Sequence, residues 1–246
     1  MNHWQALAQE LSAWPTAPRF WWRDDDAVAD STALRRMLNI AKTHRVPVHL
    51  AVIPAALEQS LDIVKDSEFS PYCYITQHGV EHQSFAREGE RKIELGGTQD
   101  IAALSAALAL GRQRLSTQFG AQYLDILVPP WNRIAPAVIA KLPEIGYRTL
   151  SVLGERSTSA VFDEVNVHID IINWKARSFA GEADILQKLT ALLLAKRSDG
   201  RDLDEPIGLM THHLDHDTAC WAFIEQFIAF CTKQDVNWVS GEQLYA

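Results

Sequence analysis

Acidic and imidazole side chains gather where strand-like segments end. Three clusters follow predicted strands at 19–24, 71–77 and 206–211: Asp24-Asp25-Asp26, His78 with His82, and His212 with His213. The carboxyl ends of parallel strands lie at one edge of an α/β fold, so these side chains should meet in one site. Carboxylates and imidazoles together bind metals and move protons, which is chemistry that a hydrolase uses.

His78 and His82 stand four residues apart, the spacing that places two imidazoles on one face of a helical turn. Two such nitrogens suit a single metal ion, and an aspartate would be the third ligand. This ligand set leaves positions open for water and substrate, as a catalytic site requires. Imidazoles favour zinc, cobalt, nickel or iron over magnesium or calcium, with manganese also open, and availability in cells makes zinc the first expectation.

The three adjacent aspartates repel one another, so a cation or a hydrogen-bond network should hold them. Successive side chains of a strand point in opposite directions, so at most two of the three face one site. The alternative is a solvated loop or a helix N-terminus. The same alternation separates His212, which shares a face with Met210, from His213. We expect His213 to pack outward or to cap the helix that begins near Asp217.

Predicted strands and helices alternate along the chain. We expect strands at 19–24, 47–53, 71–77, 123–128, 147–153, 165–172, 206–211 and 236–240, and helices at 33–44, 55–66, 98–119, 134–145, 182–196 and 218–233. This alternation predicts parallel βα units, and seven or eight strands predict a closed or nearly closed α/β barrel, with a doubly wound open sheet as the alternative. We expect one catalytic domain over residues 1–246, with residues 1–17 as a helical extension.

The composition excludes several classes of protein. The chain has 246 residues and a formal net charge of −8, and nothing in it resembles the basic surface of a nucleic-acid-binding protein. It has no uninterrupted apolar stretch of membrane-spanning length and no secretory signal pattern, so we expect a cytoplasmic enzyme without a membrane partner. Its cysteines, Cys73, Cys220 and Cys231, form neither a disulfide framework nor a CxxC zinc pair.

In this order the motifs resemble those of the polysaccharide deacetylases, the NodB-homology family of carbohydrate esterases. That family has an Asp-Asp pair after its first strand, HxxxH after its third, an arginine–proline–aromatic segment, an Asp-Trp segment and a late leucine-x-histidine. The resemblance runs from Asp25 to His212. It implies a distorted (β/α)7 barrel and a metal-dependent hydrolase that removes an acetyl or similar acyl group from an acetylated carbohydrate. An amide outside the sugars is the alternative substrate.

The resemblance also implies a role for each matching residue. Asp25 becomes the catalytic base and His212 the general acid. The metal ligands that it implies are Asp26, His78 and His82. A shift by one residue, with Asp24 as the base and Asp25 as the ligand, is the alternative alignment. The backbone N–H of the aromatic residue contributes to an oxyanion hole, and the residues expected there or in contact with substrate are Trp131, Pro130, Asn132 and Trp174.

Two positions depart from the family's pattern. Val128 stands where the family has the arginine that orients the base, so Arg23 or Arg133 would have to replace it. Asn173 stands where the family has the aspartate that tunes the acid histidine, and Asp170 is the candidate substitute. The departures suggest a different substrate and keep open a carbohydrate-binding relative without catalysis. An iron(II) oxygenase shares the ligand set but typically uses a β-rich scaffold, unlike this alternation.

Overall fold

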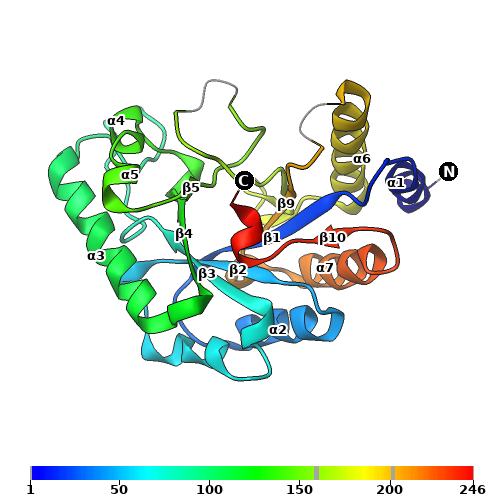
Figure 1. The fold of residues 1–246 in the computed structure, drawn as a ribbon, viewed down its shortest axis with the longest axis horizontal. Helices are drawn as coiled ribbons and strands as arrows, with labels where there is room; N and C mark the ends of the chain where they lie inside the picture. The colour runs from blue at the N-terminus through cyan, green and yellow to red at the C-terminus, as the bar shows by residue number, and fades with distance from the viewer. Residues whose placement is uncertain (1, 158–160, 201–202, 246) are drawn as a thin grey trace.

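The computed structural model describes residues 2–157, 161–200 and 203–245. At its centre lies a parallel sheet with the strand order β5-β4-β3-β2-β1-β9-β6, and β10 pairs with the start of β1 (Figure 1). The strands of this sheet are β1 Arg19–Ala27, β2 Val48–Val52, β3 Cys73–His78, β4 Tyr123–Val128, β5 Thr149–Leu150, β6 Ile169–Asp170, β9 Ile207–Thr211 and β10 Asn237–Trp238. A separate antiparallel pair consists of β7 Ile172–Asn173 and β8 Ser178–Phe179.

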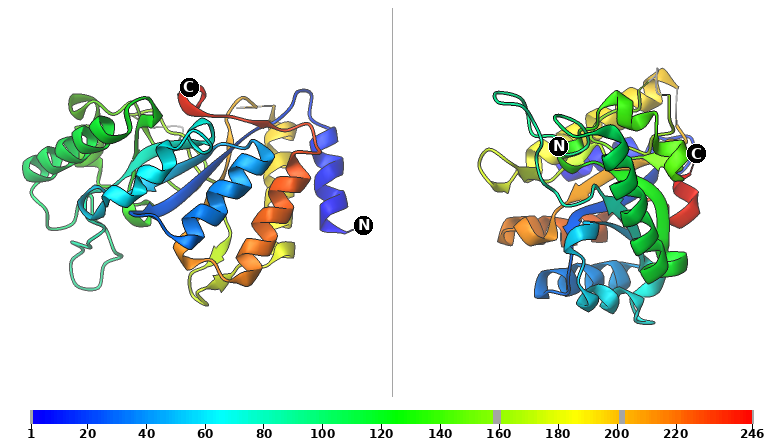
Figure 2. Two further views of the ribbon diagram at one scale, coloured as in Figure 1. Left: turned by 90° about the horizontal axis from the view of Figure 1, so that it is seen from below. Right: turned by 90° about the vertical axis from the view of Figure 1, so that its left-hand side faces the viewer.

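Helices cover the outside of the sheet (Figures 1 and 2). The α-helices are α1 His3–Ser12, α2 Thr32–His44, α3 Ile101–Phe119, α4 Pro136–Ile139, α5 Leu142–Ile145, α6 Glu182–Asp199 and α7 Thr218–Cys231. The short 3-10 helices are η1 Pro54–Ala56, η2 Gln59–Lys65, η3 Ser70–Tyr72, η4 Gly120–Gln122, η5 Pro130–Asn132, η6 His213–Asp215 and η7 Gly241–Leu244. Several of the long helices begin at an N-cap residue. The side chains of Asp100 and Asp217, for example, accept hydrogen bonds from backbone N–H groups of the first turn.

The sheet curls until one irregular segment joins its two edges. On one side of residues 163–170, the Val165 N–H donates to the Leu150 carbonyl at 2.9 Å. On the other side, the His168 N–H donates to the Gly208 carbonyl at 2.8 Å, and β6 continues the pairing with β9. The expected α/β class and distorted seven-stranded barrel are therefore confirmed, and the distortion lies in this irregular pairing.

Alternation along β1 separates an inner core from an outer core. Trp21 packs inside the barrel with Met210, whereas Trp22 belongs to the core between the sheet and the helices. Successive side chains of a strand point to opposite faces, so Arg23 follows Trp21 inward and Asp24 follows Trp22 outward. The first strand thus delivers neighbouring polar side chains to two separate environments.

Two predicted helices differ from the structure. The helix expected at 55–66 is replaced by η1 and η2, and the Arg114 guanidinium binds the carbonyls of Pro54 and Leu57 there at 2.7 and 2.8 Å. The helix expected at 134–145 is split into α4 and α5, and Pro143, which has no N–H to donate, lies in the first turn of the second.

The predicted strands at 147–153 and 165–172 shorten to β5 and to β6 with β7. Isolated bridges replace regular pairing there, with Leu150 opposite Glu164 and Leu153 opposite Val167. The alternating apolar residues of these segments therefore indicate extended, half-buried backbone without the regular pairing of a long strand.

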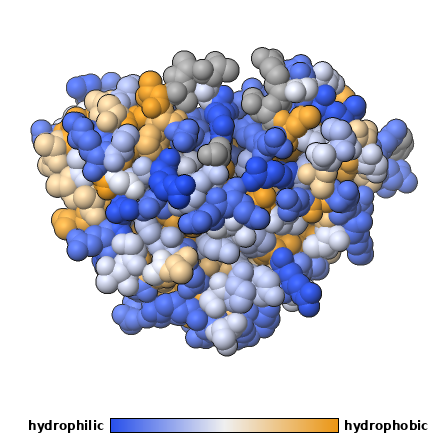
Figure 3. All heavy atoms as spheres, viewed as in Figure 1, coloured by the Kyte–Doolittle hydropathy of each residue, from blue (hydrophilic) through white to orange (hydrophobic). Residues whose placement is uncertain are grey.

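The N-terminal helix α1 packs against α6, where the Arg197 guanidinium pairs with the Glu10 carboxylate at 2.7 Å. Hydrophilic residues predominate on the face seen in Figure 3, with hydrophobic ones interspersed. Cys73, Cys220 and Cys231 are buried free thiols. Among the described residues, no helix is long and apolar enough to cross a membrane.

Candidate metal and catalytic site

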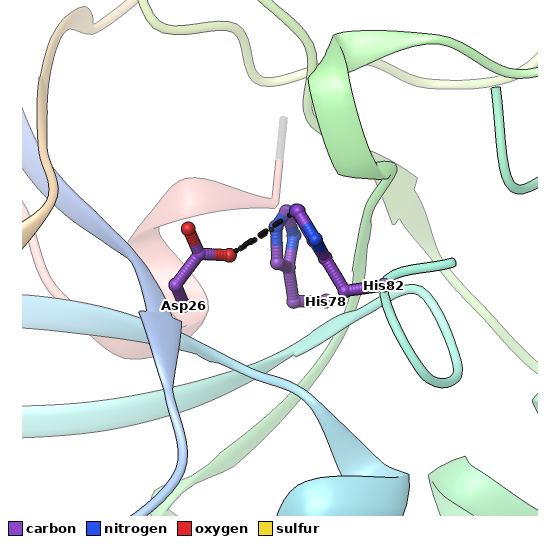
Figure 4. Close-up of side chains that lie close together, drawn as sticks. All are labelled: Asp26, His78 and His82. Carbon is purple, nitrogen blue, oxygen red and sulfur yellow. Dashed lines mark ion pairs between the residues drawn. The ribbon is translucent and has the colours of Figure 1, made fainter. Parts of the chain in front are cut away.

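Asp26, His78 and His82 converge at the carboxyl ends of β1 and β3 (Figure 4). Asp26 Oδ1 lies 3.1 Å from His78 Nε2 and 3.3 Å from His82 Nε2, and all three ligand atoms lie within 4.8 Å of one another. Burial opposes ionisation of the Asp26 carboxyl, but the neighbouring imidazoles outweigh it and hold its pKa below the usual value. One ionised carboxylate and two imidazoles facing one point fit a divalent transition metal.

The two histidines do not lie on a helical turn, so the expected local structure is wrong although the proximity is right. His78 ends β3, and the chain then reverses through Gly79, whose φ is +54°, to His82, whose φ is +58°. Glycine adopts this left-handed backbone without steric cost. A Cβ at Gly79 would also lie 1.9 Å from the Glu94 carboxylate, so the position has no room for a side chain.

Glu94 holds this turn, and sequence reasoning missed it. Its side chain is buried and accepts hydrogen bonds from the N–H groups of Val80 and Glu81 at 3.1 and 2.7 Å. Burial raises the pKa of Glu94, and those N–H groups partly oppose the increase. Nothing local in the sequence signals this role, because Glu94 lies 13 or 14 residues from its partners. His78 is oriented separately: its Nδ1 lies 3.0 Å from the Val128 carbonyl, which leaves Nε2 toward Asp26.

Asp25 faces the same cavity from the interior of the barrel. The Arg23 guanidinium binds it with two parallel hydrogen bonds, Nε to Oδ1 at 2.8 Å and Nη2 to Oδ2 at 2.9 Å. Arg23 is fully buried and also donates to the Asn132 side chain at 2.8 Å and to the hydroxyl of Ser151 at 2.8 Å. Asn132, expected to contact substrate, thus also fixes the arginine.

Arg23 therefore occupies the orienting position that Val128 leaves vacant in the expected pattern. Val128 belongs to the apolar interior of the barrel. Arg133 is not the substitute, because among the described residues its guanidinium makes no hydrogen bond or ion pair with Asp25; it binds the Lys92 carbonyl at 2.9 Å. Arg23 and Asp25 are two residues apart on one strand, so they share a face and can pair without any turn.

Asp24 faces away from the cavity, toward the helices. Its carboxylate accepts from the Thr211 hydroxyl at 2.6 Å and from the His213 N–H at 2.9 Å, and His213 Nδ1 lies 2.5 Å from its other oxygen. His213 therefore packs on the outer side of the sheet, buried against an aspartate, which is one of the two expected alternatives; it does not cap the following helix. The helix N-cap is Asp217, as expected.

The alignment with Asp25 and Asp26 in the cavity follows from an irregularity at the end of β1. The register between β1 and β2 shifts between Asp24 and Ala27, and Asp26 adopts a φ of +70°. This irregularity turns Asp26 toward the same side as Asp25, which regular alternation would prevent. The alternative pair, Asp24 with Asp25, does not share a cavity.

His212 lies across the cavity from the histidine pair. Its Nε2 is 3.9 Å from Asp25 Oδ2, and its ring packs edge-to-face on Trp174 with centroids 4.6 Å apart. The Trp174 indole N–H donates to Asp170 Oδ2 at 2.7 Å. Asp170, the expected substitute for Asn173, thus reaches the histidine through the tryptophan, and no direct hydrogen bond joins it to His212 in the described residues. Asn173 instead accepts hydrogen bonds within its own turn.

Trp131 lines the cavity beside His82, with ring centroids 4.6 Å apart. Its backbone is left-handed, with φ +55° and ψ +18°, which is uncommon for a bulky residue and marks a constrained position. Pro130 packs closely on Gly79, since a Cβ there would lie 2.6 Å from the proline ring. The η5 turn thereby aligns Trp131 with the histidine pair.

These groups line one cavity of about 660 Å³, a volume that suits a small-molecule ligand. Its lining residues are Asp25, Asp26, His78, His82, Lys92, Trp131, Asn132, Arg133, Leu153, Asp170, Trp174, Arg177, Met210, His212 and Asp215. All the expected site residues are among them except Pro130, which supports the wall from behind. Lys92, Arg177 and Asp215 are additions that the motifs did not indicate.

No protein-family model and no curated protein matches the chain. Solved structures do match it. A family 4 carbohydrate esterase from Streptomyces lividans, in complex with acetate, is 12% identical with a TM-score of 0.58, over 93% of this chain and 94% of that chain. An acetyl xylan esterase from Clostridium thermocellum, in complex with a cobalt ion, is 12% identical with a TM-score of 0.58, over 92% and 90%.

A protein from Mycobacterium smegmatis, provisionally described as a polysaccharide deacetylase, is 17% identical with a TM-score of 0.63, over 93% of this chain and 89% of that chain. Identities this low establish a likeness of fold. The resemblance that the motifs indicate therefore extends to the whole barrel, and the chain has the fold of the family 4 carbohydrate esterases and polysaccharide deacetylases.

Proposed function

We propose that this protein is a metal-dependent hydrolase that removes an acetyl group from an acetylated carbohydrate. The observation that carries the proposal is one cavity with an arginine-bound carboxylate, Asp25, between the Asp26–His78–His82 cluster and His212. Such a cavity joins a metal site to a proton acceptor and a proton donor. The names of the structural neighbours, esterases and deacetylases, support the same reaction class.

Asp26, His78 and His82 would hold the ion, and zinc is the metal that we propose first for two imidazoles and one carboxylate. When bound, a divalent ion would supply Lewis-acid polarisation of the acyl oxygen and acidify a water. The hydrogen bond from His78 to the Val128 carbonyl fixes the ring that would coordinate it. The Clostridium thermocellum esterase, a structural neighbour, is in complex with a cobalt ion, which is a divalent transition metal of this class.

Asp25 would take the proton from the attacking water. Arg23 keeps this carboxylate oriented through two hydrogen bonds, so its free lone pairs point into the cavity. His212 would donate a proton to the leaving amine or alcohol, and Trp174 holds its ring in place. The Trp131 N–H would stabilise the oxyanion, and its indole would stack on the sugar.

Acetate release from a panel of N- and O-acetylated mono- and oligosaccharides tests this function. We expect release from at least one sugar by the metal-loaded protein and none by Asp25→Asn at equal metal content. A panel without turnover, or equal release by Asp25→Asn, would contradict the proposed reaction. Elemental analysis of His78→Ala and His82→Ala tests the ligands in parallel: each variant should lose the metal, and full retention would remove that residue from the site.

A further inference from the structure

Two basic side chains at the mouth of the cavity have no acidic partner among the residues that the structure describes. Lys92 and Arg133 both line it, although the chain as a whole carries a net charge of −8. Among the described residues, neither side chain lies within 4.0 Å of a carboxylate, whereas the third cation of the rim, Arg177, lies 4.0 Å from Asp215. Lys92 and Arg133 are therefore free to bind an anion that enters from solvent.

The carboxylates inside the cavity are already engaged. Asp25 is bound by Arg23, and Asp26 faces the two imidazoles. Asp170 accepts the N–H groups of Trp174 and Ile172 at 2.7 and 2.9 Å. The basic charge at the mouth is thus not part of an internal ion-pair network.

The backbone fixes where these two cations lie. Arg133 donates from Nη1 to the Lys92 carbonyl at 2.9 Å, and the Ala135 N–H donates to the Leu95 carbonyl at 2.8 Å. Residues 83–97 are thereby attached to the segment after η5. In the left view of Figure 2 this teal loop projects from the same side of the molecule as the yellow-green β7–β8 pair, opposite the C-terminus.

The cations also lie beside the aromatic wall. Lys92 Nζ is 5.5 Å from the centre of the Trp131 ring, and Trp131 borders His82. Arg133 uses one N–H for the Lys92 carbonyl, and a guanidinium has five. The remaining donors suit the paired oxygens of a carboxylate or phosphate.

We propose that the substrate is an acidic sugar, whose carboxylate or phosphate group binds Lys92 and Arg133 while its ring lies against Trp131. The proposal rests on the proposed function for the sugar and for the orientation of its acetyl group toward the metal cluster. The anion contact itself is a binding property and does not depend on turnover. The class includes uronic acids and sugar phosphates, which differ in the anion that they present.

Calorimetric titration of three ligands tests the contact: N-acetylglucosamine, its C6 uronic acid and its 6-phosphate. At low ionic strength we expect at least one acid to bind about tenfold more tightly than the neutral sugar, and added salt should reduce the difference. Whichever acid shows the preference identifies the anion as carboxylate or phosphate. Anions that bind no tighter than the neutral sugar, or no measurable binding of either, would overturn the proposal.

A double variant, Lys92→Met with Arg133→Gln, should lose most of the preference, because glutamine keeps a donor for the Lys92 carbonyl but carries no charge. Lys188→Met with Lys233→Met, a change of two exposed lysines outside the cavity, is the matched control for net charge and should keep the preference. A preference that survives the double variant would place the anion elsewhere, for example at the metal, and overturn the assignment. Anion preference without acetate release would refute the proposed function alone; release without preference would refute this inference alone.

Discussion

Two carboxylate–imidazole pairs lie on opposite sides of the sheet, where β1 and β9 end. Asp25 and His212 face the cavity, with 3.9 Å between Oδ2 and Nε2. Asp24 and His213, their immediate neighbours in the chain, face the helices, with 2.5 Å between Oδ1 and Nδ1. Identical residue types thus form an open pair with room for a reacting group and a closed pair in direct contact.

The closed pair consists of two buried ionisable groups in direct contact. Burial opposes ionisation of both members, but the charge and hydrogen bond of the partner outweigh this effect. The pKa of Asp24 is therefore lowered and that of His213 is raised. The open pair is engaged differently, since Arg23 binds Asp25 and both Asp25 and His212 line the cavity. The comparison teaches that alternation along the strands places one aspartate and one histidine in the cavity, where we propose that they do chemistry, and buries the other two against each other outside it.

The largest expected effect separates the two aspartates. Asp25→Asn should lower kcat by about a thousandfold per folded molecule while keeping the metal, because the proton acceptor is lost. Asp24→Asn should lower it only a few-fold, since Asp24 lies outside the cavity. Turnover of both variants, corrected for the folded fraction by circular dichroism, checks this. A loss in Asp24→Asn as large as that in Asp25→Asn would reverse the roles.

The next effect separates the two histidines. His212→Ala should lose about a hundredfold on an acetamide, whose amine must be protonated on departure, and much less on an activated phenyl ester, which needs no proton. His213→Ala should show no such dependence on the leaving group. Parallel assays of both variants on both substrates decide the point. Selective loss in His213→Ala would show that His213, and not His212, is the general acid.

The third effect is on the free energy of unfolding, to which the closed pair of Asp24 and His213 should contribute. Removing one partner leaves a buried charge, so Asp24→Asn and His213→Gln should each lower the free energy of unfolding by about 3 kcal/mol. The double variant should lose clearly less than the sum, because the second change removes a charge that is already unpaired. Urea denaturation gives all three values. Simple additivity would show that the two residues act independently.

A smaller effect concerns His49, which is buried without an acidic partner in the described part of the chain and therefore contrasts with His213. Burial lowers its pKa to about 4, and its hydrogen bond to the Trp22 carbonyl only partly opposes this. The folded state therefore binds this proton less readily than the unfolded state, whose histidine titrates near its usual pKa of about 6.5. His49 alone should therefore lower the stability by about 2 kcal/mol as the pH drops from 6.5 toward 4.5.

His49→Gln, which keeps a donor for the Trp22 carbonyl, should lose less stability over that range. Urea denaturation of the wild type and the variant at several pH values is the measurement. The same slope in both proteins would show that His49 does not titrate as its burial implies.

The sequence predicts the barrel and most of the cavity, because both depend on short-range regularities. Apolar segments and strand ends locate β1, β3 and β9, and alternation correctly distinguishes His212 from His213. The pairing of Arg23 with Asp25 is also readable, since the two share one strand face. What the sequence cannot show depends on contacts between distant segments or on irregular backbone.

Three features belong to that second group. The turn between His78 and His82 is set by Glu94, whose carboxylate binds the turn's N–H groups from another part of the chain. Asp26 joins the cavity only because the strand is irregular there. The cation pair at the mouth depends on a loop whose length gives no hint of its attachment to Arg133.

Acetate release before and after metal removal tests the central claim most directly. The substrate is the best acetylated sugar of the panel, and the protein is treated with a chelator, dialysed and reloaded with one equivalent of zinc or cobalt. We predict that release stops when the metal is removed and returns on reloading in the wild type, and that reloading restores nothing in Asp25→Asn. Unchanged release by the metal-free protein would contradict a metal-dependent hydrolase at Asp26, His78 and His82.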